Sequence, residues 1–158
     1  MSDIVIKIEK ITSDEKEILR NLLEKYDYEF SQYDDRDVNN IGLYGYKYLD
    51  HYWTEEGRYA YFIRVNGKLA GFVMIRYYLS KYSISEFFVM YKYRKNGIGT
   101  HVMNDIFKEY KGKWRIGYTL KNKTAKLFWN KVVDKCTNGK YQTTIDGETD
   151  EELNFEIE

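Results

Sequence analysis

The feature that most restricts the fold is the stretch "YRKNGIGTHVMNDIF", from Tyr93 to Phe107. It places Gly97 and Gly99 directly before an amphipathic run. A helix N-terminus carries unpaired N–H groups and a positive partial charge, and glycines there let an anion approach the backbone closely. The stretch therefore predicts a phosphate site. A tight strand-to-helix turn without a ligand is the alternative interpretation.

Hydrophobic periodicity gives the elements before this turn. Alternation predicts a strand over 4–11, and Thr12 with Glu15 forms a capping box that starts an amphipathic helix. The segment 31–57 is aromatic and weakly periodic, and there we expect a loop with a short helix near 46–52. Strands follow at 58–65, 69–79 and 82–92, with a hairpin turn at Asn66–Lys68.

After the turn, the pattern predicts a helix to about Tyr110, a strand at 113–120, a helix that Asn122 caps, and two closing strands. The three consecutive strands should pair antiparallel, and the strand–helix–strand unit at about 82–120 should be parallel. The fold class is therefore α/β, with a mixed, largely antiparallel central sheet, helices on both faces and a parallel βαβ unit at the phosphate site. We expect one domain over 1–158.

Charge and composition narrow the function. Residues 91–131 hold eleven lysines and arginines against two acids, which favours an anionic ligand and also raises the alternative of nucleic-acid binding. Zero formal net charge and the lack of an RNA-binding motif argue against a nucleic-acid partner. No apolar run reaches membrane-spanning length, no signal-peptide core is present, and no metal-ligand spacing occurs. We expect a cytoplasmic protein with no membrane partner and no metal.

The stretch around the glycines resembles the GNAT superfamily of acyl-CoA-dependent N-acetyltransferases. The superfamily's pyrophosphate motif is [QR]-x-x-G-x-[GA], and the chain matches it over 94–99. A second signature, N-x-x-A-x-x-[LF]-Y, matches Asn122, Ala125 and Phe128. The order of strands and helices also fits over nearly the whole chain. The stretches "EFFVMYKYRKNGIG" and "NKTAKLFWNK" resemble, in particular, a bacterial branch of predicted acetyltransferases.

The resemblance implies acetyl-CoA as co-substrate and indicates how it binds. Its pyrophosphate would meet Arg94, Lys95, Asn96, Gly97, Ile98, Gly99 and Thr100. The pantetheine arm would lie along the strand Glu86–Met90, at Phe88 and Val89, and near Asn122 and Trp129. A backbone N–H near Val89 would polarise the thioester carbonyl.

The chain departs from the family pattern where Trp129 replaces the tyrosine that protonates the leaving thiolate. An indole N–H cannot act as a practical general acid. Tyr118 or Tyr93 could take this role, or the thiolate could leave unassisted. The remaining alternative is a non-catalytic acyl-CoA-binding or regulatory protein of the same fold. We expect turnover.

Glu86 is the candidate general base, because a carboxylate within a core strand is unusual and burial would raise its pKa. An ion pair with Arg76 or another cross-strand base is the alternative. The aromatic and acidic tract at 26–53 should bind the acceptor, a small-molecule or peptide amine, through charge and cation–π contacts. A solvated acidic loop explains the same tract equally well. The protein is expected to be a monomer or a homodimer.

Overall fold

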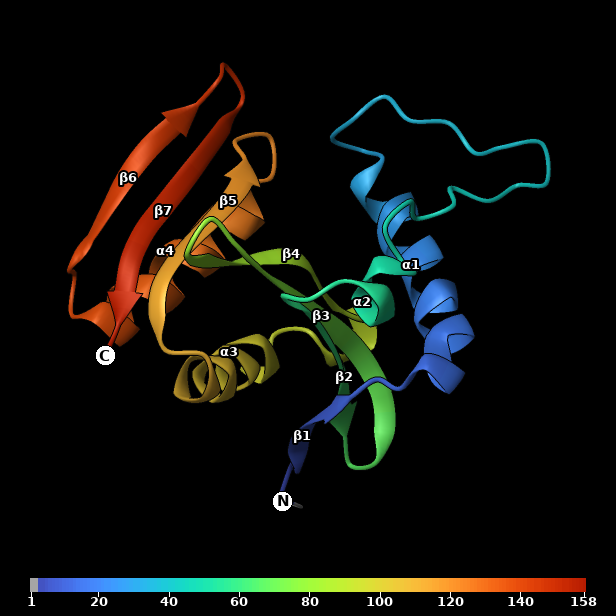
Figure 1. The fold of residues 1–158 in the computed structure, drawn as a ribbon, viewed down its shortest axis with the longest axis horizontal. Coiled ribbons are helices and arrows are strands. Elements are labelled where there is room, and N and C mark those ends of the chain that lie inside the picture. Colours follow the sequence, from blue (N-terminus) through green and yellow to red (C-terminus); the bar gives the residue numbers. More distant parts are fainter. Residues whose placement is uncertain (1–2) are drawn as a thin grey trace.

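The computed structural model describes residues 3–158, and in this part the strands form one seven-stranded sheet (Figure 1). Its order is β1-β2-β3-β4-β5-β7-β6. The strands are β1 (Ile6–Lys10), β2 (Arg58–Val65), β3 (Lys68–Tyr78), β4 (Lys81–Val89), β5 (Gly112–Thr119), β6 (Tyr141–Asp146) and β7 (Asp150–Ile157).

β4 and β5 are the one parallel pair among these strands, and the other neighbours are antiparallel. The parallel ladder joins only Tyr82 to Trp114 and Ser83 to Arg115. Beyond Ser83 no ladder joins β4 to β5, so the edge of β4 that faces β5 keeps free backbone groups. This break in the sheet creates the space for the site.

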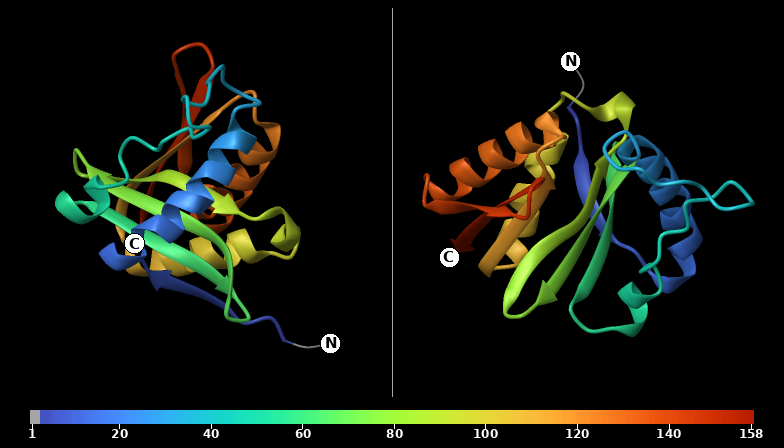
Figure 2. Two further views of the ribbon diagram at one scale, coloured as in Figure 1. Left: turned by 90° about the vertical axis from the view of Figure 1, so that its right-hand side faces the viewer. Right: turned by 90° about the horizontal axis from the view of Figure 1, so that it is seen from above.

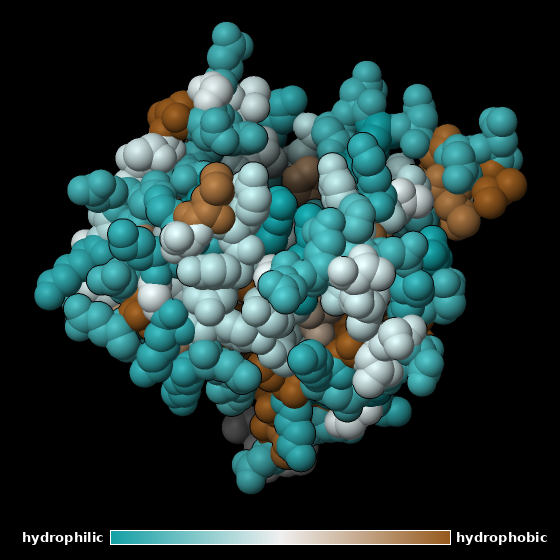
Figure 3. Space-filling model, in the orientation of Figure 1, coloured by the Kyte–Doolittle hydropathy of each residue, from teal (hydrophilic) through white to brown (hydrophobic). Residues whose placement is uncertain are grey.

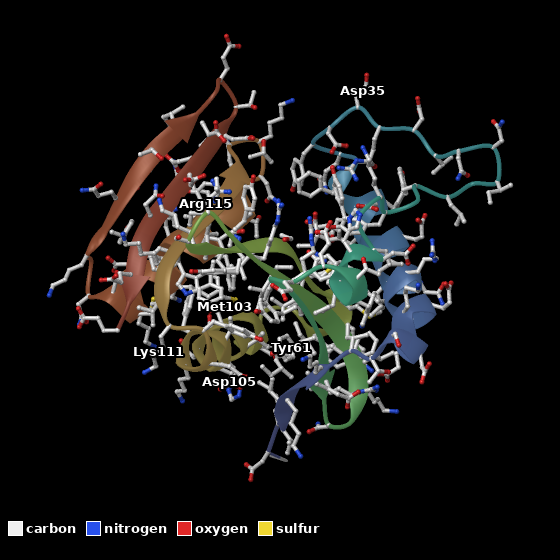
Figure 4. All side chains as sticks on the ribbon, in the orientation of Figure 1. Asp35, Tyr61, Met103, Asp105, Lys111 and Arg115 are labelled. Atoms are coloured by element: carbon white, nitrogen blue, oxygen red, sulfur yellow. The ribbon has the colours of Figure 1, made fainter. Side chains whose placement is uncertain are left out.

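Helices cover both faces of the sheet (Figure 2). α1 (Lys16–Phe30) and the short α2 (His51–Thr54) lie on one face, and α3 (Ile98–Glu109) and α4 (Lys123–Thr137) lie on the other. Two separate apolar cores result, one under each helix layer. In Figure 4, Met103 points from α3 into the larger core. The expected mixed α/β class, with its parallel unit, is confirmed.

A β-bulge at Ser85 decides which way the end of β4 faces. Met74 of β3 pairs with Glu86, and Ile75 pairs with Ile84, so Ser85 has no partner. Ile84 packs in the core under α3 and α4, whereas Phe88 packs in the core under α1. Because side chains alternate along a strand, the extra residue moves Glu86 and Phe88 to the α1 face.

Both predicted helix starts are confirmed. Thr12 N–H donates to the Glu15 carboxylate over 3.0 Å, and Asn122 Oδ1 accepts from Ala125 N–H over 3.0 Å. A 3₁₀ turn, η1 (Ser13–Glu15), precedes α1. No helix within residues 3–158 is both long and apolar enough to cross a bilayer.

Two boundaries differ most from expectation. The short helix expected near 46–52 lies at His51–Thr54, because Glu24 of α1 holds the backbone of Tyr44 and Gly45 and the residues after them form only i→i+3 turns. The strand expected over 82–92 ends at Val89. There the chain turns, since Tyr93 N–H donates to Met90 C=O over 2.8 Å in a second 3₁₀ turn, η2 (Tyr91–Tyr93).

Candidate active site

The two glycines before α3 have different tasks. Gly97 has φ +72°, in the left-handed region, and no atom lies within 4 Å of where its Cβ would stand. It supplies a backbone conformation and leaves the turn open. Gly99 supplies room, because a Cβ there would lie 2.8 Å from the ring of Phe128 on α4. The turn and the packing of α3 on α4 are therefore both set by glycine.

The backbone N–H groups at the start of α3 are free to bind an anion. Among residues 3–158, none of the N–H groups of residues 95–100 has a backbone acceptor, and the first turn of α3 carries no acid. Lys95, with φ +66°, lies in the same turn. This combination suits phosphate oxygens.

Arg94 has other partners in the structure. Its Nε donates to Val89 C=O over 2.7 Å, and its two terminal nitrogens donate to the carboxylate of Glu29 on α1, each over 2.6 Å. The bond to Val89 ties the turn to the end of β4, and the bidentate pair with Glu29 ties it to the last turn of α1. The side chain that the motif places at the pyrophosphate thus also braces the loop.

The N–H of Val89 points into the gap between β4 and β5. Met90 N–H donates to Ala70 C=O over 2.7 Å, and Val89 pairs with Gly71. Because donors alternate in an antiparallel ladder, Val89 N–H and C=O face away from β3. The bond from Arg94 to the Val89 carbonyl agrees with this direction. The Phe88 side chain instead faces α1 and packs on Tyr26 and Phe72.

A cleft of about 600 Å³ opens where β4 and β5 part. Figure 3 shows the surface hollowed between the side formed by β5 to β7 and the side formed by α1. Its lining includes Asn122 at the start of α4, Trp129 in the middle of that helix, Glu86 on β4, Tyr118 on β5, and the loop 44–48. Trp129 is buried and lies edge-on against Phe87 and Phe128. Four predicted residues from distant parts of the sequence thus meet at this cleft: Glu86, Tyr118, Asn122 and Trp129. Its lining does not include Phe88, Val89 or residues 94–100.

Glu86 lies at the α1 side of this cleft. Burial raises the pKa of its carboxyl to about 7, and hydrogen bonding from Tyr26 and Tyr46 opposes that rise. No basic side chain within residues 3–158 lies in ion-pair distance of Glu86. Arg76 instead lies over the ring of Tyr78. The alternative, an ion pair with Arg76 or another cross-strand base, is therefore wrong, and the carboxyl can take up a proton near neutral pH.

The Tyr118 hydroxyl is engaged in hydrogen bonds and is not free to donate its proton to another group. Its hydroxyl donates to Glu151 of β7 and accepts from Asn130 Nδ2 over 2.8 Å. Burial, together with the bond to Glu151, raises the pKa of this phenol to about 12. The Tyr118 hydroxyl is thus committed to Glu151, and Tyr93 lies outside the lining of the cleft.

A second cavity of about 560 Å³ adjoins the cleft and shares Phe30 and residues 117–119 with it. Its charged lining consists of six acids and Lys121. The acids are Asp34, Asp35, Asp146, Asp150, Glu151 and Glu152. In Figure 4, Asp35 stands at the top of the segment that follows α1. The path into the cleft from this side is thus strongly acidic.

Residues of the acidic and aromatic tract at 26–53 occupy different places in the structure. Asp27, Asp37 and the tyrosines of 44–48 line the cleft, and Asp35 lines the second cavity. Glu29 instead binds Arg94. The sequence reasoning missed that pair and the Glu151–Tyr118 contact, which join distant residues and leave no local signal. The bulge had a signal: the adjacent polar residues Ser85 and Glu86 interrupt the alternation of β4.

No group of three histidine, cysteine or acidic side chains within residues 3–158 is arranged to hold a metal. The expected absence of a metal stays a prediction.

Comparison with known proteins gives a family. The model of the Acetyltransferase (GNAT) family matches residues 16–132. A search of curated proteins found no significant match. An acetyltransferase from Thermus thermophilus shares the fold with a TM-score of 0.74 at 11% identity, over 96% of this chain and 97% of that one.

Two other solved structures are similar. One is spermidine N-acetyltransferase from Vibrio cholerae in complex with CoA and spermine, with a TM-score of 0.69 at 9% identity, covering 96% of this chain and 95% of that one. The other is the ribosomal-protein-S18-alanine N-acetyltransferase from Escherichia coli, with a TM-score of 0.63 at 14% identity, covering 97% and 94%. At such identities the likeness shows the fold alone.

Proposed function

Because this chain belongs to the GNAT acetyltransferase family, we propose that it transfers an acetyl group from acetyl-CoA to a primary amine by direct attack. The observation that carries the proposal is the break between β4 and β5. The break leaves the Val89 N–H without a strand partner and a carboxyl of raised pKa in the cleft, and an open anion site follows β4 at the start of α3. Membership of the family gives the class of enzyme. The groups around the cleft support an amine as acceptor and acetyl-CoA as donor.

The residues present fit acetyl-CoA. The N–H groups of 95–100 would hold the pyrophosphate, with Lys95 beside it. The free edge of β4 would bond to the pantetheine arm as an added strand would, with Asn122 and Trp129 on the facing wall. Bound there, acetyl-CoA supplies an activated acyl group. Arg94 would keep the turn in place through Val89 and Glu29.

The chemistry then follows from the groups at the cleft. Val89 N–H would donate to the thioester carbonyl oxygen and stabilise the negative charge that develops on it. Glu86, directly or through a water, would accept the proton of the attacking amine. The carbon–nitrogen bond forms and the carbon–sulfur bond breaks, with the electron pair leaving on the thiolate. A thiol has an ordinary pKa near 8.5, so the thiolate can leave without a general acid.

The acidic second cavity and the tyrosines of 44–48 favour a cationic acceptor. A small-molecule amine and a peptide or protein amine both meet this description. Among similar structures, one is named for spermidine and one for a ribosomal protein's alanine.

Trp129 supports a second candidate, a non-catalytic acyl-CoA-binding protein, because the position where the family pattern has tyrosine carries no practical acid here.

Release of free thiol from acetyl-CoA across a panel of amines separates the two candidates. We expect amine-dependent release, with mass spectrometry showing one acetyl group added to the acceptor. Binding of CoA without release from any amine would favour the non-catalytic candidate instead.

A further inference from the structure

One carboxylate of α1 holds the segment between α1 and α2 at the point where that segment reaches the cleft. Glu24 of α1 accepts from Tyr44 N–H over 2.7 Å and from Gly45 N–H over 2.9 Å. Two successive backbone donors on one carboxylate fix both the position and the orientation of this turn. The next residue is Tyr46, which lines the cleft.

Tyr46 connects this fastening to Glu86. Tyr46 and Glu86 line the same cleft, and the Tyr46 hydroxyl, like that of Tyr26 on α1, lowers the pKa of Glu86 against the effect of burial. Tyr26 is fixed independently, since its ring packs between Phe72 and Phe88. Tyr46 lies in irregular backbone, and its side chain packs at the margin of the core under α1. Its place at the carboxyl therefore depends on this packing and on what holds the turn before it.

We propose that Glu24 is a positioning residue that sets the protonation of Glu86 by holding Tyr46 against it. The proposal rests on the proposed function, because it assigns a role within the same cleft. Glu24 touches backbone only and acts through Tyr46, so it is not itself a catalytic residue.

The groups that face Glu86 fix the sign of the effect. Tyr26 and Asp27 face it from α1, Arg36 and Tyr46 from the segment that follows, and Tyr52 from α2. Tyr46 stabilises the carboxylate, so losing it leaves burial less opposed. The pKa of Glu86 should then rise, and the acidic limb of the rate profile should move to higher pH.

The test compares Glu24→Gln with Asp50→Asn. Asp50 contacts Lys16 of α1 over 2.7 Å, so it ties the same segment to the same helix at the other end, away from the cleft. We expect Glu24→Gln to move the acidic limb of kcat/KM upward by about half a pH unit or more, and Tyr46→Phe to do the same. Asp50→Asn should leave it in place.

Different outcomes would contradict the role of Glu24 and the proposed function of Glu86. An unmoved profile in Glu24→Gln, with Glu86→Gln strongly impaired, would overturn the role of Glu24 alone. A profile that Glu86→Gln does not alter would overturn the base itself. Thermal unfolding of Glu24→Gln checks folding, and Tyr46→Phe provides an independent arm should that variant fold poorly.

Discussion

At the scale of one residue, the buried carboxyl of Glu86 that suits its proposed role as a base also lowers the stability of the fold. An isolated carboxyl has a pKa near 4.5, and burial raises that of Glu86 to about 7. The folded state therefore holds a proton between these two values that the unfolded chain releases. As the pH rises through this window, the free energy of unfolding must fall.

Replacing Glu86 with Gln removes that penalty. We predict that at pH 8 Glu86→Gln is more stable than the wild type by about 1–3 kcal/mol in the free energy of unfolding. It should therefore unfold at a higher temperature. At pH 4, where both states of the wild type are largely protonated, the gain should shrink toward zero. Calorimetry at the two pH values checks this, and an equal effect at both would show that the carboxyl is not desolvated.

Some candidate site residues could be predicted from sequence because their signal is local. Gly97 and Gly99 stand between a strand and a helix, and Asn122 sits at a helix start. The partners of Arg94 and Tyr118 could not be assigned, since Glu29 and Glu151 lie far away in the chain. Such pairs form only after the sheet has assembled. No local pattern encodes them.

At the scale of elements, the start of α3 rests on two different uses of glycine. Gly97→Ala should cost about 1–2 kcal/mol of stability, because alanine is strained at φ +72°. The added methyl group contacts no other atom. Gly99→Ala adds a Cβ 2.8 Å from the Phe128 ring, which we expect to cost about 1–3 kcal/mol. The two variants should therefore differ in how they respond to a change in α4.

Phe128→Leu makes that difference measurable. We predict that it restores part of the stability lost in Gly99→Ala and none of that lost in Gly97→Ala. Denaturant unfolding of the single and double variants gives the coupling energies. Equal coupling of Phe128 to both glycines would contradict the division of roles.

The bulge in β4 also belongs to this scale. Without the extra residue Ser85, alternation would place Glu86 with Ile84, under α3 and α4. The sequence allowed Glu86 to be chosen as a candidate base because it is a carboxylate in a core strand. Which face it occupies depends on the register of β3 with β4, and register follows from the packing of both cores. The bulge therefore turns a core position into a cleft position.

At the scale of the whole molecule, the order of elements was well encoded. Periodicity and turn residues predicted the strands, the long helices and the parallel unit. The aromatic segment between α1 and α2 was the least predictable part, because tertiary bonds from Glu24 and Arg36 hold it rather than local structure. That same segment lines the cleft on the side where we propose that the acceptor binds. Sequence therefore indicated the donor side better than the acceptor side.

The most direct test of the account is the pH dependence of kcat/KM for an accepted amine, in the wild type and in Glu86→Gln. We predict an acidic limb with an apparent pKa near 7 in the wild type, following Glu86. In Glu86→Gln that limb should disappear and the plateau should fall about 10²-fold. Coincident profiles for the two proteins would contradict the claim that Glu86 accepts the proton of the attacking amine.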